Sequence, residues 1–173
     1  MSVVSVIIPT YNRASLVTEA MDSVRDQTHR PIECIVVDDG STDDTAEVVT
    51  DWKQEHKTDQ FSVRLLRQEN QGAPAARNHG MEEASGDFLL FLDSDDRLVP
   101  NAIDQLHQVL SETRYDVAYG DVRLIEGQGQ ERRRDQSPSA SSHVVNMLNN
   151  APLTSSALLK RDGIRSVRWR EDL

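Results

Sequence analysis

Apolar runs of strand length alternate with amphipathic segments along the first 125 residues. Strands are expected at residues 3–8, 32–40, 62–68, 86–93 and 116–125. Helices are expected at residues 13–27, 41–56, 73–85 and 101–113. This alternation favours an α/β fold, with a mostly parallel sheet and helices on both of its faces. The fourth strand is too apolar to be exposed on either face, as in the centre of such a sheet.

Turn and cap residues mark the expected boundaries of these elements. Pro9 is expected to end the first strand, and Asn12 to cap the helix that follows it. Ser41 or Thr42 is expected to open the second helix. Gly80 lies inside the third helix.

The pattern is weaker after residue 125. The Gly, Ser, Pro and charge content of residues 126–142 predicts a loop. Residues 143–164 suggest a helix, a turn and a short strand. No internal repeat is visible along the chain.

The composition is that of a soluble globular domain. The 173 residues suffice for one domain with a sizeable core, and 37% of them are hydrophobic. No apolar run reaches the roughly 18 to 20 residues of a membrane span. The segment after Met1 lacks the pattern of a signal peptide, so a cytoplasmic location is expected. Cys34, the single cysteine, lies in the apolar run "IECIVV" and is expected to be a buried, inert thiol.

The formal net charge of -10 argues against a nucleic acid as the main partner, because phosphate backbones need a basic face. Two basic clusters, "ERRRD" at 131–135 and "KRDGIRSVRWR" at 160–170, are expected to be solvated faces. Contact of these clusters with an anionic substrate or a lipid surface stays an open alternative. A peripheral position at the inner face of the membrane is therefore left open as well.

Three polar stretches, "PTYNR", "VDDGSTDD" and "DSDD", follow expected strands. In open parallel sheets, ligands bind in the crevice at the carboxyl ends of the strands. The sheet is therefore expected to bring these stretches together at one site.

The acidic stretch at 93–96 can hold a divalent cation. Asp93 and Asp95, two positions apart at a strand end, can reach one Mg²⁺ or Mn²⁺ whose other ligands are water and phosphate oxygens. An EF-hand loop is excluded, because Leu98 and Asp104 stand where that loop needs Gly and a bidentate acid at its end. A phosphatase of the haloacid dehalogenase type is disfavoured by Arg97. A polar turn with helix-capping acids remains the alternative.

The order and spacing of several motifs resemble the family 2 glycosyltransferases, which are inverting enzymes of the GT-A fold with nucleotide-sugar donors. These motifs are "VSVIIPTYNR", "IVVDDGSTDDT", "NQGAPAARNHGMEEASGDFLLFLDSDD" and "YDVAYGDV". The resemblance is clear over residues 3 to 121 and weaker in "SSALLKRDGIRSVRWREDL". It implies one GT-A-like domain at 1–173, with a Rossmann-like nucleotide-sugar-binding half at 1–98 and a partial acceptor-binding half at 99–173.

The resemblance also implies roles for individual residues. Thr10 and Tyr11 match positions that contact uracil, and the ring of Tyr11 offers a face for stacking. Asp39 matches the residue that accepts a hydrogen bond from the base. Arg77 matches a basic position near the nucleotide, where a guanidinium suits a diphosphate, and a salt bridge to a carboxylate is its alternative. Asp93 matches the residue that binds ribose.

Further residues complete the implied donor site. Asp95 matches the metal ligand, with Asp93 as a second ligand, and Pro9 and Ser94 belong to the donor-binding motifs. Asp96 is expected either to support the metal site or to cap the next helix. Asp38 is expected to be structural.

The implied reaction is a single displacement on a UDP-linked donor, with a divalent cation opposite the leaving diphosphate. A carboxylate base would deprotonate the acceptor hydroxyl, which belongs to a carbohydrate, a lipid-linked sugar or another acceptor. Asp172 is the expected base and Glu171 the second choice, by resemblance to the family's Glu-Asp pair. Catalytic domains of the family continue beyond that pair, so the acceptor half is expected to be truncated and its activity reduced.

Two readings from other classes stay open. One is a non-catalytic module that binds a nucleotide sugar. The other is a receiver-like signalling domain, which is disfavoured because the pair Asp38 and Asp39 follows the second strand instead of the first. A dinucleotide-binding fold is disfavoured, because no G-x-G-x-x-G follows a strand.

Overall fold

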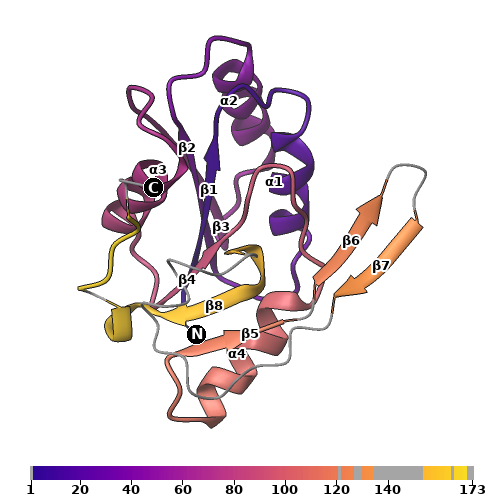
Figure 1. The fold of residues 1–173 in the computed structure, drawn as a ribbon, viewed down its shortest axis with the longest axis vertical. Helices are drawn as coiled ribbons and strands as arrows, with labels where there is room; N and C mark the ends of the chain where they lie inside the picture. The colour runs from indigo at the N-terminus through magenta and orange to yellow at the C-terminus, as the bar shows by residue number, and fades with distance from the viewer. Residues whose placement is uncertain (1, 121, 127–129, 135–153, 165, 171–173) are drawn as a thin grey trace.

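The structure is a computed structural model that describes residues 2–120, 122–126, 130–134, 154–164 and 166–170 (Figure 1). Its centre is a six-stranded sheet in the order β3-β2-β1-β4-β8-β5. The strands of this sheet are β1 (Val4–Thr10), β2 (Ile32–Asp38), β3 (Phe61–Arg67), β4 (Phe88–Phe91), β5 (Val117–Tyr119) and β8 (Ala157–Lys160).

The sheet is mostly parallel, as the alternation of strands and helices predicts. Strand β1 pairs in parallel with β2 and β4, and β2 pairs in parallel with β3. Strand β8 is antiparallel to both of its neighbours, β4 and β5. The carboxyl ends of β1, β2 and β4 therefore meet at one edge of the sheet.

Helices cover both faces of the sheet (Figure 1). The helices are α1 (Val17–Arg25), α2 (Thr45–His56), α3 (Ala73–Glu83) and α4 (Ala102–Glu112). Helices α1, α2 and α4 share one buried cluster with side chains of the sheet, whereas α3 belongs to a second cluster with the segment around Trp169. Residues 88–91 are all buried, which confirms that β4 is covered on both faces.

Gly80 brings α3 close to the sheet. A Cβ atom at this position would overlap Cγ2 of Ile7 and lie 3.2 Å from Cγ2 of Val37. The glycine therefore allows a helix–sheet distance that any side chain would increase. Arg77 lies about one turn earlier on the same helix.

Strand β1 continues through Pro9 to Thr10, so the expectation that Pro9 ends the strand is wrong. Consecutive residues of a parallel strand bond to opposite neighbours. The carbonyl oxygen of Ile7 accepts a bond of 3.0 Å from Leu92 N, so Ile7 and Pro9 face the side of β4. Because β4 ends at Phe91, the missing N–H of Pro9 removes no ladder bond.

Two helix starts also differ from expectation. Helix α1 begins at Val17 instead of after Asn12, which adopts a φ of 52° and accepts a 2.8 Å bond from Thr42 N. Helix α2 begins at Thr45, because Ser41 and Thr42 are engaged with Asn12. Both expected caps thus join the loops after β1 and β2.

The chain after residue 115 is partly described. The segment expected as one strand at 116–125 forms two, β5 and then β6 (Val122–Glu126). Strand β6 pairs with β7 (Gln130–Arg134), where a loop was expected. The short strand expected within 143–164 is β8, which lies between two 3₁₀ turns, η1 (Thr154–Ser156) and η2 (Arg161–Ile164). The helix expected there lies outside the described residues.

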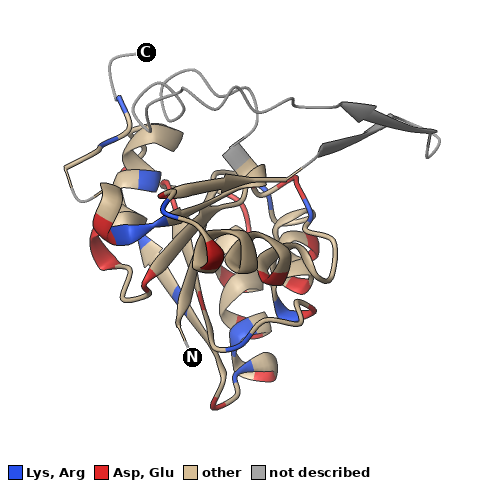
Figure 2. Cartoon of the chain, turned by 90° about the horizontal axis from the view of Figure 1, so that it is seen from below, with Lys and Arg blue, Asp and Glu red and all other residues tan. Residues whose placement is uncertain are grey.

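The single cysteine lies where the sequence predicts it, and charged side chains lie on the described surface. Cys34 is buried in β2, and burial, with a smaller effect of Glu33, raises the pKa of its thiol to about 12. Figure 2 shows Lys and Arg interspersed with Asp and Glu over the described part of that view. No helix in the described ranges is long and apolar enough to cross a membrane.

Candidate functional site

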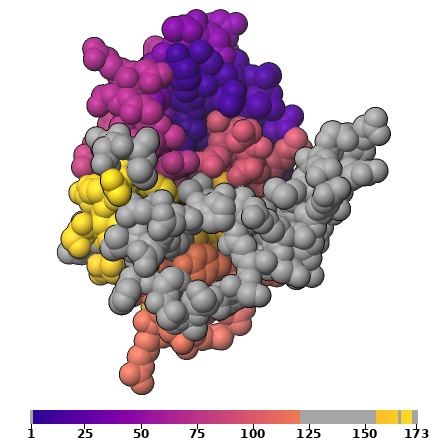
Figure 3. Space-filling model, in the orientation of Figure 1, coloured from indigo at the N-terminus to yellow at the C-terminus, as the bar shows by residue number. Residues whose placement is uncertain are grey.

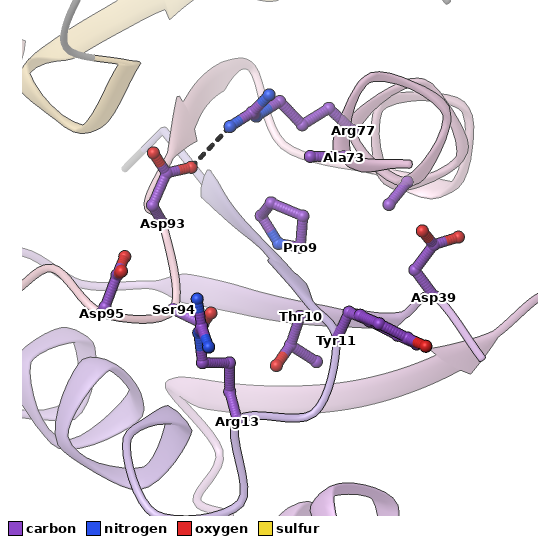
Figure 4. Close-up of a pocket in the computed structure, with 11 residues that line it drawn as sticks. Pro9, Thr10, Tyr11, Arg13, Asp39, Ala73, Arg77, Asp93, Ser94 and Asp95 are labelled. Atoms are coloured by element: carbon purple, nitrogen blue, oxygen red, sulfur yellow. Dashed lines mark hydrogen bonds and ion pairs between the residues drawn. The ribbon is translucent and has the colours of Figure 1, made fainter. Parts of the chain in front are cut away.

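A cavity of about 330 Å³ opens where β1, β2 and β4 end, as the polar stretches after these strands predict (Figure 4). Every described residue of its wall comes from the first 95 positions. The wall is formed by Pro9, Thr10, Tyr11, Arg13, Asp39, Ala73, Ala76, Arg77, Asp93, Ser94 and Asp95. The structure thus brings all the expected donor-site residues together. Arg13 is a basic residue that sequence reasoning missed, although it belongs to the quoted motif "PTYNR".

The end of β1 supplies a buried hydroxyl and an exposed ring. Thr10 is 3% exposed, and its buried Oγ1 makes no hydrogen bond with the described part of the chain. Tyr11, the next residue, is 45% exposed, so its aromatic ring is available to a ligand. Its neighbour Arg13 is exposed and extends toward Ser94 in Figure 4.

Asp39 is buried and holds the loop before α3. Its Oδ1 accepts hydrogen bonds from Gln68 Nε2 (2.8 Å) and Gln71 N (2.9 Å), and its Oδ2 accepts one from Gly72 N (2.7 Å). An ionised carboxylate has about four acceptor positions. One position thus remains for a donor in the cavity.

Asp38 has a structural role, as expected. It is fully buried, and its Oδ1 accepts a bond of 2.9 Å from Ser41 N. Arg67 Nε donates to its Oδ2 over 3.0 Å. Asp38 is therefore not part of the described cavity wall, and the two adjacent acids have different surroundings.

Arg77 and Asp93 form an ion pair across the cavity, with 2.6 Å between Nη2 and Oδ1 (Figure 4). The guanidinium also lies 4.7 Å from the ring centroid of Trp169, a cation–π distance. Trp169 is fixed to Asn78 of α3, because Trp169 N donates to Asn78 Oδ1 (2.8 Å) and Asn78 Nδ2 donates to Trp169 O (3.0 Å). Figure 3 shows the segment 154–170 (yellow) below the α3 segment (magenta).

The three acids of the "DSDD" turn have different environments. Asp95 is exposed and makes no hydrogen bond or ion pair with another described residue. Asp96 is half-buried, and its Oδ2 accepts a bond of 2.5 Å from Ser155 Oγ. Burial raises the pKa of Asp96, the hydrogen bond from Ser155 lowers it, and the charges of Asp93 and Asp95 raise it, so that the net shift is upward.

Asp96 does not line the cavity. Its backbone N donates to Asp93 O over 2.9 Å, which closes the turn. The sequence alternative of a capping acid is not observed, because Asn101 occupies the N-cap position of α4.

Glu171 and Asp172, the expected catalytic pair, lie outside the described residues. The last described residue is Arg170, directly after the buried Trp169. Their assignment stays a prediction.

Known proteins similar to this chain are glycosyltransferases. Residues 5–168 match the family model described as "Glycosyl transferase family 2". A GalNAc(5)-diNAcBac-PP-undecaprenol beta-1,3-glucosyltransferase of Campylobacter jejuni is 38% identical over 125 residues, which cover 72% of this chain and 39% of that protein.

Solved structures share the fold. S. aureus TarS (residues 1–349) has a TM-score of 0.78 and 25% identity, covering 100% of this chain and 51% of that one. The mannosyltransferase PcManGT of Pyrobaculum calidifontis has a TM-score of 0.74 and 23% identity, covering 98% of this chain and 48% of that one.

The mixed sheet, with its ligand-sized cavity at the strand ends, has the fold of the GT-A transferases. The chain belongs to glycosyltransferase family 2. The chain spans 39% of the length of the C. jejuni enzyme and about a fifth of the length of an uncharacterized glycosyltransferase of Rickettsia felis.

Proposed function

We propose that this chain binds a nucleoside-diphosphate sugar, most suitably a UDP sugar, and transfers the sugar to an acceptor hydroxyl with inversion and with help from Mn²⁺ or Mg²⁺. The observation that carries this proposal is the convergence of Tyr11, Asp39, Asp93 and Asp95 on one cavity. Related folds support the ligand class. TarS has been solved with UDP and with UDP-GlcNAc, and PcManGT with GDP-Man and Mn²⁺.

The nucleoside is expected to lie at the ends of β1 and β2. The exposed ring of Tyr11 offers a stacking surface, and Asp39 retains one acceptor position for an N–H group of the base. Thr10 Oγ1 is a buried group that a polar ligand atom can satisfy. Asp93 lines the cavity beside Ser94 and Asp95, where ribose would follow the base.

The donor set fits a divalent cation that is shared with the substrate. In the described part of the chain, no group of three or more His, Cys, Asp or Glu side chains is arranged to hold a metal. Mg²⁺ and Mn²⁺ in phosphate-transfer sites commonly use one or two carboxylates together with substrate phosphates. Asp95 would hold the ion, with Asp93 as the second carboxylate. When bound, the ion supplies Lewis-acid stabilisation of the leaving diphosphate.

The proposed division of labour follows the cavity wall. Residues 1–98 would bind the donor, because the wall residues that the structure describes all lie within them. Residues 99–173 would contribute to the acceptor side, with Asp172 as the proposed base and Glu171 as the second choice. Inversion follows if the base deprotonates the acceptor hydroxyl for a direct attack on the anomeric carbon.

The acceptor is proposed to be a carbohydrate or lipid-linked hydroxyl. The C. jejuni relative is named for an undecaprenol-linked saccharide. A cytoplasmic position, with peripheral contact at the inner face of the membrane, fits this acceptor class. No nucleic acid is proposed as a partner, given the net charge of -10.

A thermal-shift panel tests the donor proposal. UDP, GDP, UMP and the sugars of the two diphosphates are added with and without Mn²⁺, because a ligand of the native state raises the melting temperature. UDP is expected to raise the melting temperature more than GDP or UMP. If no nucleotide changes the melting temperature, the proposed function is wrong.

A substitution tests the proposed base. Asp172→Asn should slow sugar transfer and leave the affinity for UDP unchanged.

A further inference from the structure

A serine from the far end of the described chain holds the acidic turn. Ser155 Oγ accepts a hydrogen bond of 3.1 Å from Asp93 N and donates one of 2.5 Å to Asp96 Oδ2. A hydroxyl group suits this place, because it donates and accepts at the same time. The two bonds join the first and the last residue of the turn through one side chain.

The sheet fixes the position of Ser155. Residue 155 lies in η1, immediately before β8, and β8 pairs antiparallel with β4 through Leu90 and Leu158. The neighbouring Ser156 O accepts a bond of 2.7 Å from Gly120 N. The hydroxyl of Ser155 is therefore presented to the end of β4 by a segment that is bonded to the sheet.

The residues after the turn are fixed on the opposite side, by helix α1. Leu98 N donates to Ser23 Oγ over 3.1 Å, and Arg97 forms an ion pair with Glu19. The turn is thus held between η1 and α1. Both of its flanks are bonded, and the exposed Asp95 lies between them at the cavity.

We propose that Ser155 is a positioning residue, which holds the turn from Asp93 to Asp96 in the shape that presents the Asp95 carboxylate to a divalent cation. By engaging Asp96, Ser155 also keeps that carboxylate out of the cavity wall. A residue of the acceptor half thereby sets the geometry of the donor half. The inference rests on the proposed function, because it requires the nucleotide and metal site described above.

The test measures how strongly a metal ion promotes nucleotide binding. Calorimetry gives the Kd of UDP without metal and with Mn²⁺, and the ratio of these two values is the readout. In Ser155→Ala, both bonds to the turn are lost while Asp95 is retained. The ratio is expected to fall about three- to tenfold, which is the fold-change that the loss of one or two hydrogen bonds produces. The Kd without metal should change by less than about twofold.

Two matched variants serve as controls. Ser111→Ala removes an exposed hydroxyl from α4 instead of from the turn, and its ratio should equal that of the unmodified chain. Ser155→Thr keeps the hydroxyl and should restore most of the ratio. If Ser155→Ala does not fold, Ser155→Cys replaces it, because a thiol is similar in size but a weak donor and acceptor.

The outcomes separate the two proposals. A folded Ser155→Ala or Ser155→Cys protein with an unchanged ratio would overturn the role of Ser155 and leave the proposed function standing. If the unmodified chain binds neither UDP nor GDP, the proposed function fails, and Mn²⁺ titrated alone by electron paramagnetic resonance still tests Ser155. Equal Mn²⁺ affinity in both proteins would then reject the inference.

Discussion

Arg77 and Asp93, which the sequence assigns to different parts of a bound nucleotide, bind each other over 2.6 Å. Their side chains are 12% and 35% exposed, so the pair is only partly open to water. The Arg77 guanidinium also lies over the ring of Trp169. Arg77 is therefore placed to orient Asp93, in addition to any contact with a diphosphate.

A double-mutant cycle distinguishes these two roles of Arg77. Arg77→Ala and Asp93→Asn should each weaken UDP binding, and the double variant should be much less impaired than the sum of the two. A coupling energy of about 1 to 3 kcal/mol is expected for two residues in direct contact. Calorimetry with UDP measures it. Additive effects would mean that each residue contacts the nucleotide independently.

The elements were predictable because their signals are local. Residues 88–91 are apolar on both faces, and Val17, Ala20, Met21 and Val24 recur at helical spacing and are buried. Strand β7 was missed because residues 130–134 are polar and lack the alternation of a half-buried strand. The continuation through Pro9 depends on where β4 ends, which the sequence of β1 cannot indicate.

The sequence predicted which residues of the donor side line the candidate site, but not the hydrogen bonds that hold them in place. The expected strand ends predicted that three polar stretches converge, because parallel strands bring their carboxyl ends together, and the family resemblance implied Tyr11, Asp39 and Asp95 within them. Ser155 was missed since it lies 59 residues from Asp96, outside every quoted donor motif. Only the antiparallel insertion of β8 beside β4 brings that serine to the site.

Asp95 should carry the metal dependence of nucleotide binding. Asp95→Asn is expected to abolish the gain in UDP affinity that Mn²⁺ gives, because it removes the exposed carboxylate at the cavity. The affinity without metal should remain similar. Calorimetry with and without Mn²⁺ measures both values. Asp51→Asn, which removes the same charge from an exposed position on α2, is the control. UDP binding that ignores Mn²⁺ in the unmodified chain would contradict the assignment.

Asp39 should contribute more to nucleotide binding than the hydroxyl of Tyr11. Asp39→Ala removes an acceptor to the base and three bonds to the loop before α3. A hydrogen bond to a charged group is worth about 1.5 to 3 kcal/mol. Tyr11→Phe keeps the stacking face and should cost less than about 0.5 kcal/mol. Both values come from calorimetry with UDP, and the reverse order would refute this base pocket.

Gly80→Ala should destabilise the protein, although alanine is the better helix former by about 1 kcal/mol. The added Cβ would overlap Ile7 and press on Val37, and overpacking of a core costs about 1 to 3 kcal/mol. Urea unfolding measures the net loss. Gly120→Ala is the control, because the nearest described atom to a Cβ there is 3.8 Å away. Equal stability of both variants would show that α3 shifts without cost.

Glu33 should make the stability of the fold depend on pH. This side chain of β2 is 7% exposed, and its Oε2 accepts bonds from Ser5 Oγ (2.7 Å), Ser85 N (2.9 Å) and Ser85 Oγ (3.0 Å). Burial, the largest single effect, raises its pKa, but these bonds and the charge of Arg64 together outweigh burial. The pKa of Glu33 is therefore lowered from its ordinary value of 4.5.

The direction of this shift fixes the sign of the pH effect. A carboxylate with a lowered pKa in the folded state contributes stability above its unfolded pKa, and loses it as the pH falls through the folded pKa. Glu33→Gln should cost about 1 to 3 kcal/mol at pH 7, because the amide weakens a charge-assisted network. The difference in unfolding free energy between Glu33→Gln and the unmodified chain should shrink as the pH falls below 4.5, the ordinary pKa of a glutamate. Urea unfolding at pH 7, 5 and 3.5 measures this trend, with the exposed Glu47→Gln as the control. A loss that stays constant over this range would assign the effect of Glu33 to packing and not to its charge.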